Sequence, residues 1–136
     1  MGAIQGLQGM RHIALMVRDI KRSKAFYQEM FGMDVVWEPD PANVYLSSGP
    51  DNVALHELAS GTEPKPDSQF LDHLGFIVES VERVRELEAD FRSKGVKIVK
   101  AFKAHRDGSS SFYCTDPDGI VIQMLYEPAL SRQRTS

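Results

Sequence analysis

Two histidines occupy the same point of a repeated segment, and side chains of this type can bind a metal ion. His12 begins the segment His-Ile-Ala-Leu-Met-Val, and His73 begins the similar segment His-Leu-Gly-Phe-Ile-Val. A repeat of this kind indicates two copies of one supersecondary unit. Because imidazole nitrogen is a common ligand of divalent transition metals, pseudo-symmetry between the copies predicts one metal centre that contains both histidines.

Glu57 and Gln123 are single polar residues in the apolar segments that close the two copies. Aligning the copies places Glu57 on Gln123, so the repeat predicts that the two side chains occupy matching positions. A polar group that lacks a partner among apolar neighbours costs about 1–3 kcal/mol, and more if it is charged. A shared metal ion would satisfy all four polar groups. The candidate metal ligands are His12, Glu57, His73 and Gln123.

The periodicity of apolar residues predicts the elements that position these groups. In residues 10–59, an apolar strand at 10–17 precedes a helix that begins after Asp19 and ends at Gly32. Three short strands then follow, separated by turns rich in Pro, Gly, Asp and Asn. Their predicted ranges are 34–38, 43–48 and 52–59. This first module is therefore predicted to have the order βαβββ.

Residues 72–126 repeat that order. A strand at 72–78 is followed by a helix that Ser80 caps and Gly95 ends. The remaining strands are predicted near 97–102, 109–114 and 120–126. The whole pattern predicts an α+β fold built from two tandem βαβββ modules.

The segments outside the modules contain few apolar residues. Residues 60–71 are polar and rich in proline, which predicts a linker between the modules. Residues 127–136 are expected to form a flexible tail. A chain of 136 residues has the usual size of one domain, so we expect residues 1–136 to form a single domain.

Composition and charge exclude several classes of protein. The single Cys114 excludes an intramolecular disulfide and fits a reducing compartment, so we expect a cytoplasmic protein. A net charge of −3 argues against a nucleic-acid partner. No apolar run is long enough to span a membrane, and residues 1–9 lack the pattern of a signal peptide.

A local basic cluster lies in the segment 94–106. If residues 97–103 form a strand, regular alternation sends Lys97 and Lys103 to one face of the sheet and Lys100 to the other. The expectation is therefore a solvated strand margin rather than a single basic patch. Docking of an anionic substrate group at this margin stays open as an alternative.

The chain resembles the vicinal oxygen chelate superfamily, which includes glyoxalase I, methylmalonyl-CoA epimerase, extradiol dioxygenases, fosfomycin resistance enzymes and bleomycin-binding proteins. The resemblance runs from Met10 to about Tyr126. It is carried by the two histidine segments, by the helix end from Phe26-Tyr27 to Phe31-Gly32 and by the turn Asp116-Pro117-Asp118-Gly119. It implies modules whose mixed sheets curl into a half-barrel around a metal, with helices outside, and it implies a homodimer.

The same resemblance implies a metal-dependent enzyme whose ligands come from the first and last strands of each module. On this chain those positions are His12, Glu57, His73 and Gln123. The implied cofactor is a divalent ion such as Fe, Mn, Co, Ni or Zn. The implied substrate is a small organic molecule that binds the ion through two adjacent oxygens, for lyase or isomerase chemistry. Glu57 would be a ligand and the catalytic base.

The chain departs from glyoxalase I at the positions that serve its glutathione substrate. A glutamate usually stands where this chain has Gln123, and an amide cannot take up a proton. Met16 and Gln69 stand where arginines bind glutathione, and Gly61 stands in place of an asparagine. A glutathione-dependent reaction is therefore not expected.

Two other functions stay open. An extradiol-type dioxygenase would use both histidines with one carboxylate, which only Glu57 could supply. A metal-free binding protein of the bleomycin resistance type would use the half-barrel only as a cleft, but such a protein has no need of a ligand set. Three further side chains have specific expectations: Tyr113 could orient a substrate oxygen, His56 should face a helix or solvent, and His105 should lie in a solvated loop.

Overall fold

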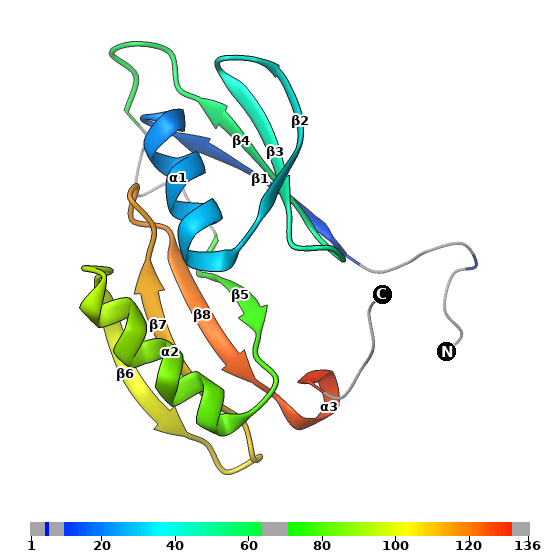
Figure 1. The fold of residues 1–136 in the computed structure, drawn as a ribbon, viewed down its shortest axis with the longest axis vertical. Helices are drawn as coiled ribbons and strands as arrows, with labels where there is room; N and C mark the ends of the chain where they lie inside the picture. The colour runs from blue at the N-terminus through cyan, green and yellow to red at the C-terminus, as the bar shows by residue number, and fades with distance from the viewer. Residues whose placement is uncertain (1–4, 6–9, 64–70, 132–136) are drawn as a thin grey trace. The chain divides into compact units, whose positions relative to one another are not determined.

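The computed structural model describes residue 5 and the ranges 10–63 and 71–131, which form two compact units divided after Thr62 (Figure 1). Unit 1 contains the first module and unit 2 contains the second. Each unit has the predicted order βαβββ, and the predicted α+β fold class is confirmed. Much of the predicted linker and the end of the predicted tail lie outside the described residues.

Unit 1 is a four-stranded mixed sheet with one helix against it. The strand order is β1-β4-β3-β2, in which β1 and β4 are parallel and the other neighbours are antiparallel. The elements are β1 (His12–Val17), α1 (Ile20–Phe31), β2 (Asp34–Asp40), β3 (Asn43–Ser47) and β4 (Asn52–Glu57).

Helix α1 begins and ends where the sequence predicts. The Asp19 side chain accepts a hydrogen bond from the backbone N–H of Arg22 at 3.2 Å, which caps the first turn. Gly32 ends the helix with a φ of 64°, a left-handed conformation that glycine adopts without strain. Ile20 and Tyr27 are buried, and the helix contacts β3 and β4. Burial of these apolar side chains holds α1 on the sheet.

Unit 2 repeats this architecture, with the strand order β5-β8-β7-β6 and β5 parallel to β8. Ser80 caps its first long helix by accepting a hydrogen bond from the Arg83 N–H at 3.1 Å. Phe91 of that helix packs edge to face against Phe112 of the sheet, with 5.6 Å between ring centroids. The elements are β5 (Leu74–Ile77), α2 (Val81–Ser93), β6 (Ile98–Ala104), β7 (Ser110–Thr115), β8 (Val121–Tyr126) and α3 (Pro128–Ser131).

Helix α3 occupies the first part of the segment that was expected to be a flexible tail. The Ser131 N–H donates to the Glu127 carbonyl at 2.7 Å, and the Ser131 hydroxyl donates to the Val78 carbonyl at 2.8 Å. These two bonds connect the end of β8 to the end of β5 through helix α3. Among the described residues, no helix has the length and apolar content needed to cross a membrane.

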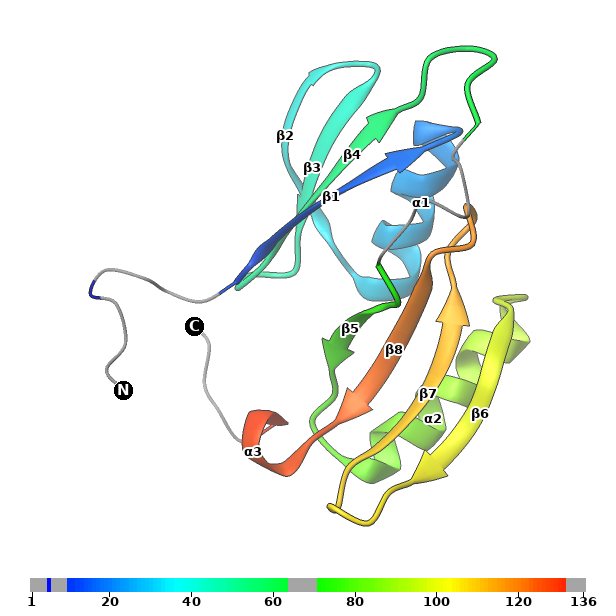
Figure 2. The same cartoon turned by 180° about the vertical axis from the view of Figure 1, so that it is seen from behind.

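Each sheet has one face toward its helix and one face away from it, which we call the open face (Figure 1 and Figure 2). Strand β1 alternates between the two. Leu15 and Val17 are buried toward α1, whereas His12, Ala14 and Met16 are exposed on the open face. Any chemistry of His12 therefore takes place on the open face of unit 1.

Candidate functional site

His12 lies at the start of β1 with its ring held in place by a neighbour. Its Nδ1 is 2.7 Å from Oδ1 of Asn52, which is also its pairing partner on β4. If Nδ1 donates this bond, Nε2 carries the lone pair and can bind a metal. Among the described residues, Nε2 of His12 has no hydrogen-bond partner.

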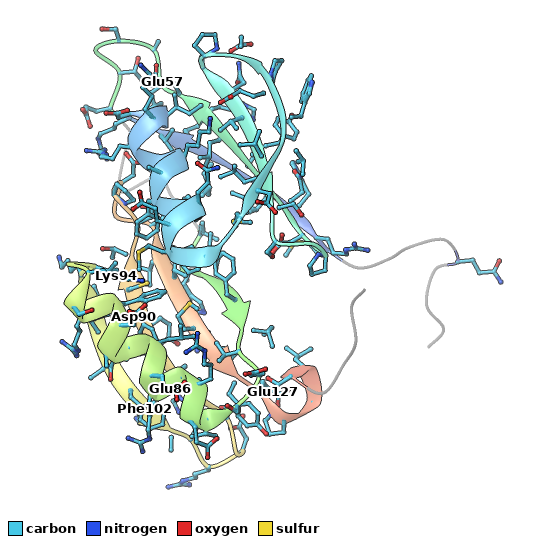
Figure 3. All side chains as sticks on the ribbon, viewed as in Figure 1. Glu57, Glu86, Asp90, Lys94, Phe102 and Glu127 are labelled. Carbon is cyan, nitrogen blue, oxygen red and sulfur yellow. The ribbon has the colours of Figure 1, made fainter. Side chains whose placement is uncertain are left out.

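Glu57 lies far from His12 and on the other face of the sheet. Asn52 is opposite His12, and Glu57 is five residues further along β4, a separation of about 16 Å at about 3.3 Å per residue. Its carboxylate oxygen Oε2 accepts a hydrogen bond from the backbone N–H of Ile20 at 2.9 Å, at the first turn of α1 (Figure 3). The structure thus gives Glu57 the role of anchoring helix α1 to the end of β4.

The strand register explains why the expected match between Glu57 and Gln123 does not hold. Ala14 of β1 pairs with Ala54, and the corresponding Gly75 of β5 pairs with Gln123. The counterpart of Gln123 is therefore Ala54, three residues before Glu57. A shift by an odd number of residues moves a side chain to the opposite face of a strand. Glu57 consequently lies on the helix side.

His73 and Gln123 lie close together on the open face of unit 2. Gln123 pairs with Gly75, two residues beyond His73 on the same face. Gly75 has no side chain to separate them, and both polar side chains are half-buried. His73 Nδ1 is 2.6 Å from Oδ2 of Asp72, so this ring is also held through Nδ1. Two of the four predicted ligands are therefore neighbours within one unit.

Tyr113 belongs to the same cluster. It pairs with Gln123 across β7 and β8, and its ring meets the His73 ring edge to face at 5.3 Å between centroids. The ammonium of Lys100 is 5.1 Å from the centre of the tyrosine ring. Tyr113 therefore lies beside two of the candidate ligands, His73 and Gln123.

Two irregularities in β6 change the expected directions of its lysines. The register of β6 with β7 shifts between Ile98 and Lys100 and again between Lys100 and Lys103. Lys100 consequently pairs with Tyr113, and Lys103 pairs with Ser111, so both lysines lie on the open face. The prediction that alternation separates Lys100 from Lys103 is wrong, because a β-bulge interrupts the period of two.

The hairpin between β6 and β7 brings His105 to Ser111. His105 Nε2 is 3.5 Å from the Ser111 hydroxyl, at the outer limit of a hydrogen bond. The carboxylate of Asp107 accepts hydrogen bonds from the hydroxyl and the backbone N–H of Ser109, and these bonds lower the pKa of Asp107 below its usual value. His105 is exposed in the β6–β7 hairpin, as expected for a solvated loop, and its ring lies near Ser111 of the open face.

The open face of unit 1 carries an aromatic row beside His12. The Tyr45 ring lies 6.1 Å from the His12 ring and 6.1 Å from the His56 ring, measured between centroids. Trp37 meets Tyr45 edge to face at 5.0 Å. His56 Nδ1 is 2.6 Å from Oδ1 of Asn43. His56 therefore faces away from helix α1.

Three residues that hold the histidine rings were not predicted from the sequence: Asn52, Asn43 and Asp72. Each holds the Nδ1 atom of a histidine through a side-chain oxygen. Asp72 precedes His73 directly, which is a local signal, but Asn52 and Asn43 are brought to their histidines only by strand pairing. Fixing Nδ1 in this way is typical of histidines that bind a metal through Nε2.

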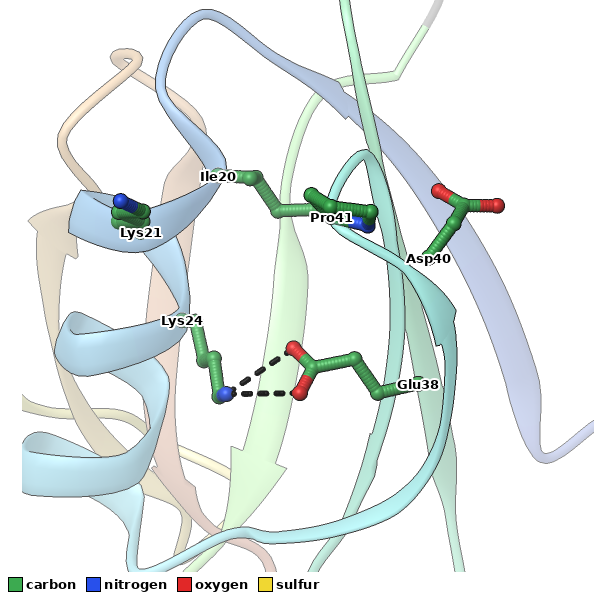
Figure 4. A pocket seen from close by; sticks show the side chains of 6 residues that line it. All are labelled: Ile20, Lys21, Lys24, Glu38, Asp40 and Pro41. Atoms are coloured by element: carbon green, nitrogen blue, oxygen red, sulfur yellow. Dashed lines mark hydrogen bonds and ion pairs between the residues drawn. The ribbon is translucent and has the colours of Figure 1, made fainter.

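A pocket of about 460 Å³ lies on the helix side of unit 1, away from His12 (Figure 4). Lys24 of α1 and Glu38 of β2 form an ion pair across it, with Nζ to carboxylate distances of 2.9 and 3.1 Å. The lining residues are Ile20, Lys21, Lys24, Glu38, Asp40 and Pro41. None of the predicted site residues lines this pocket.

Within the described residues, no three His, Cys, Asp or Glu side chains gather closely enough to hold a metal ion. Unit 1 supplies one oriented imidazole, from His12. Unit 2 supplies a second, from His73, with the Gln123 amide beside it. Imidazole nitrogen and amide oxygen are suitable donors for a divalent transition ion, so these residues fit such a cofactor chemically.

The chain has relatives among curated proteins. It is 29% identical over 121 residues to the glutathione transferase FosA of Serratia marcescens, covering 87% of this chain and 80% of that protein. It is 28% identical over 130 residues to the uncharacterized protein YwkD of Bacillus subtilis, covering 89% of this chain and 98% of that protein.

Solved structures share the fold at lower identity. The lactoylglutathione lyase of Agrobacterium tumefaciens matches with a TM-score of 0.74 at 20% identity, covering 93% of this chain and 98% of that one. The model of the Glyoxalase/Bleomycin resistance protein/Dioxygenase superfamily matches residues 9–124, which span both modules. The two βαβββ units and this match show that the chain belongs to the Glyoxalase/Bleomycin resistance protein/Dioxygenase superfamily.

Proposed function

We propose that this protein is a metal-dependent enzyme of the glyoxalase type, which acts as a lyase or isomerase on a small organic substrate without using glutathione. The observation that carries the proposal is the orientation of His12 and His73. Each ring is held through Nδ1 by a side-chain oxygen, at 2.7 and 2.6 Å, and each presents Nε2 as a donor. A histidine that binds a metal through Nε2 commonly has its Nδ1 held in this way.

The proposed ligand set is His12, His73 and Gln123. We leave Glu57 out of this set, although the sequence predicts it as a ligand and base, because its carboxylate accepts a hydrogen bond from the Ile20 N–H on the helix side. All three remaining donors are neutral when bound. The ion in such a set would be a divalent Fe, Mn, Co, Ni or Zn, with positions open for two adjacent oxygens of the substrate.

A homodimer is part of the proposal. His12 belongs to unit 1, and the other two ligands belong to unit 2. The exposed Met16 and Trp37 on the open face of unit 1 are the kind of apolar surface that a partner covers.

The residues around the proposed ligands indicate what happens to the substrate. When bound, the metal would supply a Lewis acid that stabilises negative charge on the two substrate oxygens. Tyr113 lies against His73 and beside Gln123, where its hydroxyl can donate a hydrogen bond to a substrate oxygen. On unit 1, Tyr45 and Trp37 provide an aromatic surface next to His12 that can exclude water from an apolar part of the substrate.

A dioxygenase is the second candidate, and the position of Glu57 counts against it. The ligand set typical of non-heme iron oxygenases contains two histidines and one carboxylate. With Glu57 on the helix side and an amide at Gln123, the proposed centre has no carboxylate. A metal-free binding protein is the third candidate, and the two histidine rings held through Nδ1 count against it.

The test is elemental analysis of the purified, untagged protein after anaerobic loading with Fe, Mn, Co, Ni and Zn in separate samples. We expect about one tightly held ion per site in the wild type and its loss in His12→Ala and His73→Ala. His56→Ala is the matched control, because His56 is also an open-face histidine held by an asparagine. A wild type that retains no metal would rule out the proposed enzyme and favour the binding protein.

A further inference from the structure

We propose that the open face of unit 2 carries a second binding point, for an anionic group at the far end of the substrate, formed by Lys103 and His105 with Lys100 beside it. The inference rests on the proposed function only in naming the substrate as the molecule that carries this group. The anion is a carboxylate or a phosphate-like group, and the experiment below distinguishes the two.

The register shift between Lys100 and Lys103 places both lysines on the open face, and we call this pair the basic row. Without this shift the two side chains would point to opposite faces. The shifted register places Lys100 opposite Tyr113 and Lys103 opposite Ser111, and these β7 residues share the open face. Residues directly opposite each other in an antiparallel pair point to the same side. Two positive charges therefore line one side of the face that carries His73 and Gln123.

The charges of this row are not neutralised by nearby carboxylates. Among the described residues, neither Lys100 nor Lys103 has a carboxylate partner. Three acidic side chains of α2 pair with basic residues of the same helix or its C-cap: Arg83 with Glu86, Arg92 with Glu88, and Lys94 with Asp90. Glu86, Asp90 and Lys94 are labelled in Figure 3. Asp107 of the β6–β7 hairpin is bound by Ser109. A negatively charged ligand group is the natural partner that the row lacks.

His105 completes the binding point, and Ser111 positions it. The Ser111 side chain is 1% exposed, although it belongs to the open face, so neighbouring side chains cover it. Its hydroxyl meets His105 at Nε2, which leaves Nδ1 of the ring available to donate a hydrogen bond to an anion. Ser111 is therefore a positioning residue, whereas Lys103 and His105 would contact the ligand.

The spacing along β7 limits the size of the substrate. Tyr113 lies beside Gln123, and Ser111 is two residues away on the same face, a distance of about 7 Å. The anionic group would accordingly lie about 7 Å from the oxygens near Gln123 and Tyr113. This separation fits a small acid in which a few bonds connect the adjacent oxygens to a terminal carboxylate or phosphonate.

The experiment is a titration of ¹⁵N-labelled, metal-free protein with succinate and, separately, with methylphosphonate, at constant ionic strength. Binding at the proposed point predicts saturable shifts of the amide signals of Lys103, His105 and Ser111. The probe that binds with the higher affinity identifies the class of anion. We expect Lys103→Met and His105→Gln each to weaken binding by about tenfold, the loss expected for a hydrogen bond to a charged group.

Lys94→Met is the matched control, because Lys94 is a lysine of unit 2 that pairs with Asp90 on the helix side. It should leave the affinity unchanged. Shifts that do not saturate, or an equal loss in Lys94→Met, would overturn the proposal. The titration contains no metal, so a failure to bind the anions would contradict the anion site without affecting the metal-site proposal. Conversely, a protein that retains no metal would contradict the proposed enzyme without affecting the anion titration.

Discussion

The hydrogen bond between Glu57 and helix α1 provides the sharpest test of the site. Glu57→Ala removes the acceptor for the Ile20 N–H, which lies 2.9 Å from Oε2. A hydrogen bond to a charged group contributes about 1.5–3 kcal/mol, and a negative charge at a helix N-terminus adds about 0.3–1 kcal/mol. Because Glu57 is exposed, solvent screens part of this gain. We expect the free energy of unfolding to fall by about 1.5 kcal/mol.

The variant Glu57→Gln removes the negative charge but keeps an oxygen that can accept the hydrogen bond. Its amide oxygen can still accept from Ile20, so we expect a loss of only about 0.5 kcal/mol, which is the charge–dipole part. Urea unfolding followed by circular dichroism measures both values, and Glu57→Ala should also lower Tm by about 5 °C. Glu29→Ala is the control, because Glu29 is an exposed glutamate of the same helix. Its free energy of unfolding should change by less than about 0.5 kcal/mol.

Metal analysis of the same variants then tests the assignment. If Glu57 only anchors α1, Glu57→Gln binds as much metal as the wild type. If Glu57→Gln loses the metal while its unfolding free energy equals that of the wild type, Glu57 is a ligand. That result would refute the reasoning from strand register and hydrogen bonding.

Three further predictions concern other parts of the chain. Asn52→Ala should weaken metal binding by about tenfold in a competition titration, because the His12 ring loses the oxygen that orients it; an unchanged affinity would contradict the proposed tautomer control. Phe91→Ala should lower the free energy of unfolding by about 3–5 kcal/mol in urea, since the ring is buried against Phe112; a loss below about 1 kcal/mol would show that this contact is not part of the core. Burial, with a smaller effect of the Asp116 charge, raises the pKa of the Cys114 thiol from 9.0 to about 12. The thiol therefore ionises more readily in the unfolded chain, and stability should be unaffected below pH 9 and fall by up to about 1.4 kcal/mol per pH unit between pH 9 and 12. Cys114→Ala should remove this alkaline component, and an equal decline in that variant would assign it to other groups.

The sequence predicted the fold because its signals are local. The caps Asp19 and Ser80, the stop at Gly32 and the alternation of apolar residues each depend on neighbours within a few positions of the chain. The predicted elements agree with the structure to within about two residues at most ends, which is the usual uncertainty of element boundaries. The repeated histidine segments likewise identified the family before any geometry was known.

The partners of the site residues could not be predicted in the same way, because they depend on strand register. An alignment of the two copies placed Glu57 on Gln123, yet pairing makes Ala54 the counterpart. A register change by an odd number of residues reverses the face of every side chain, and a gapped alignment of short strands does not define it. The register shift between Lys100 and Lys103, which brings both side chains to one face, leaves no clear mark in the sequence.

By itself, the sequence determined the superfamily, the order of elements in each unit and the presence of two histidines at equivalent points. Only the tertiary structure decided that Asn52 and Asp72 orient those histidines, that Glu57 serves helix α1, and that lysines of β6 gather beside Tyr113. The physical reason is that propensity and periodicity act over a few neighbouring residues. Hydrogen bonds between strands join residues that are tens of positions apart, and a shift of one residue in their register changes which side chains meet.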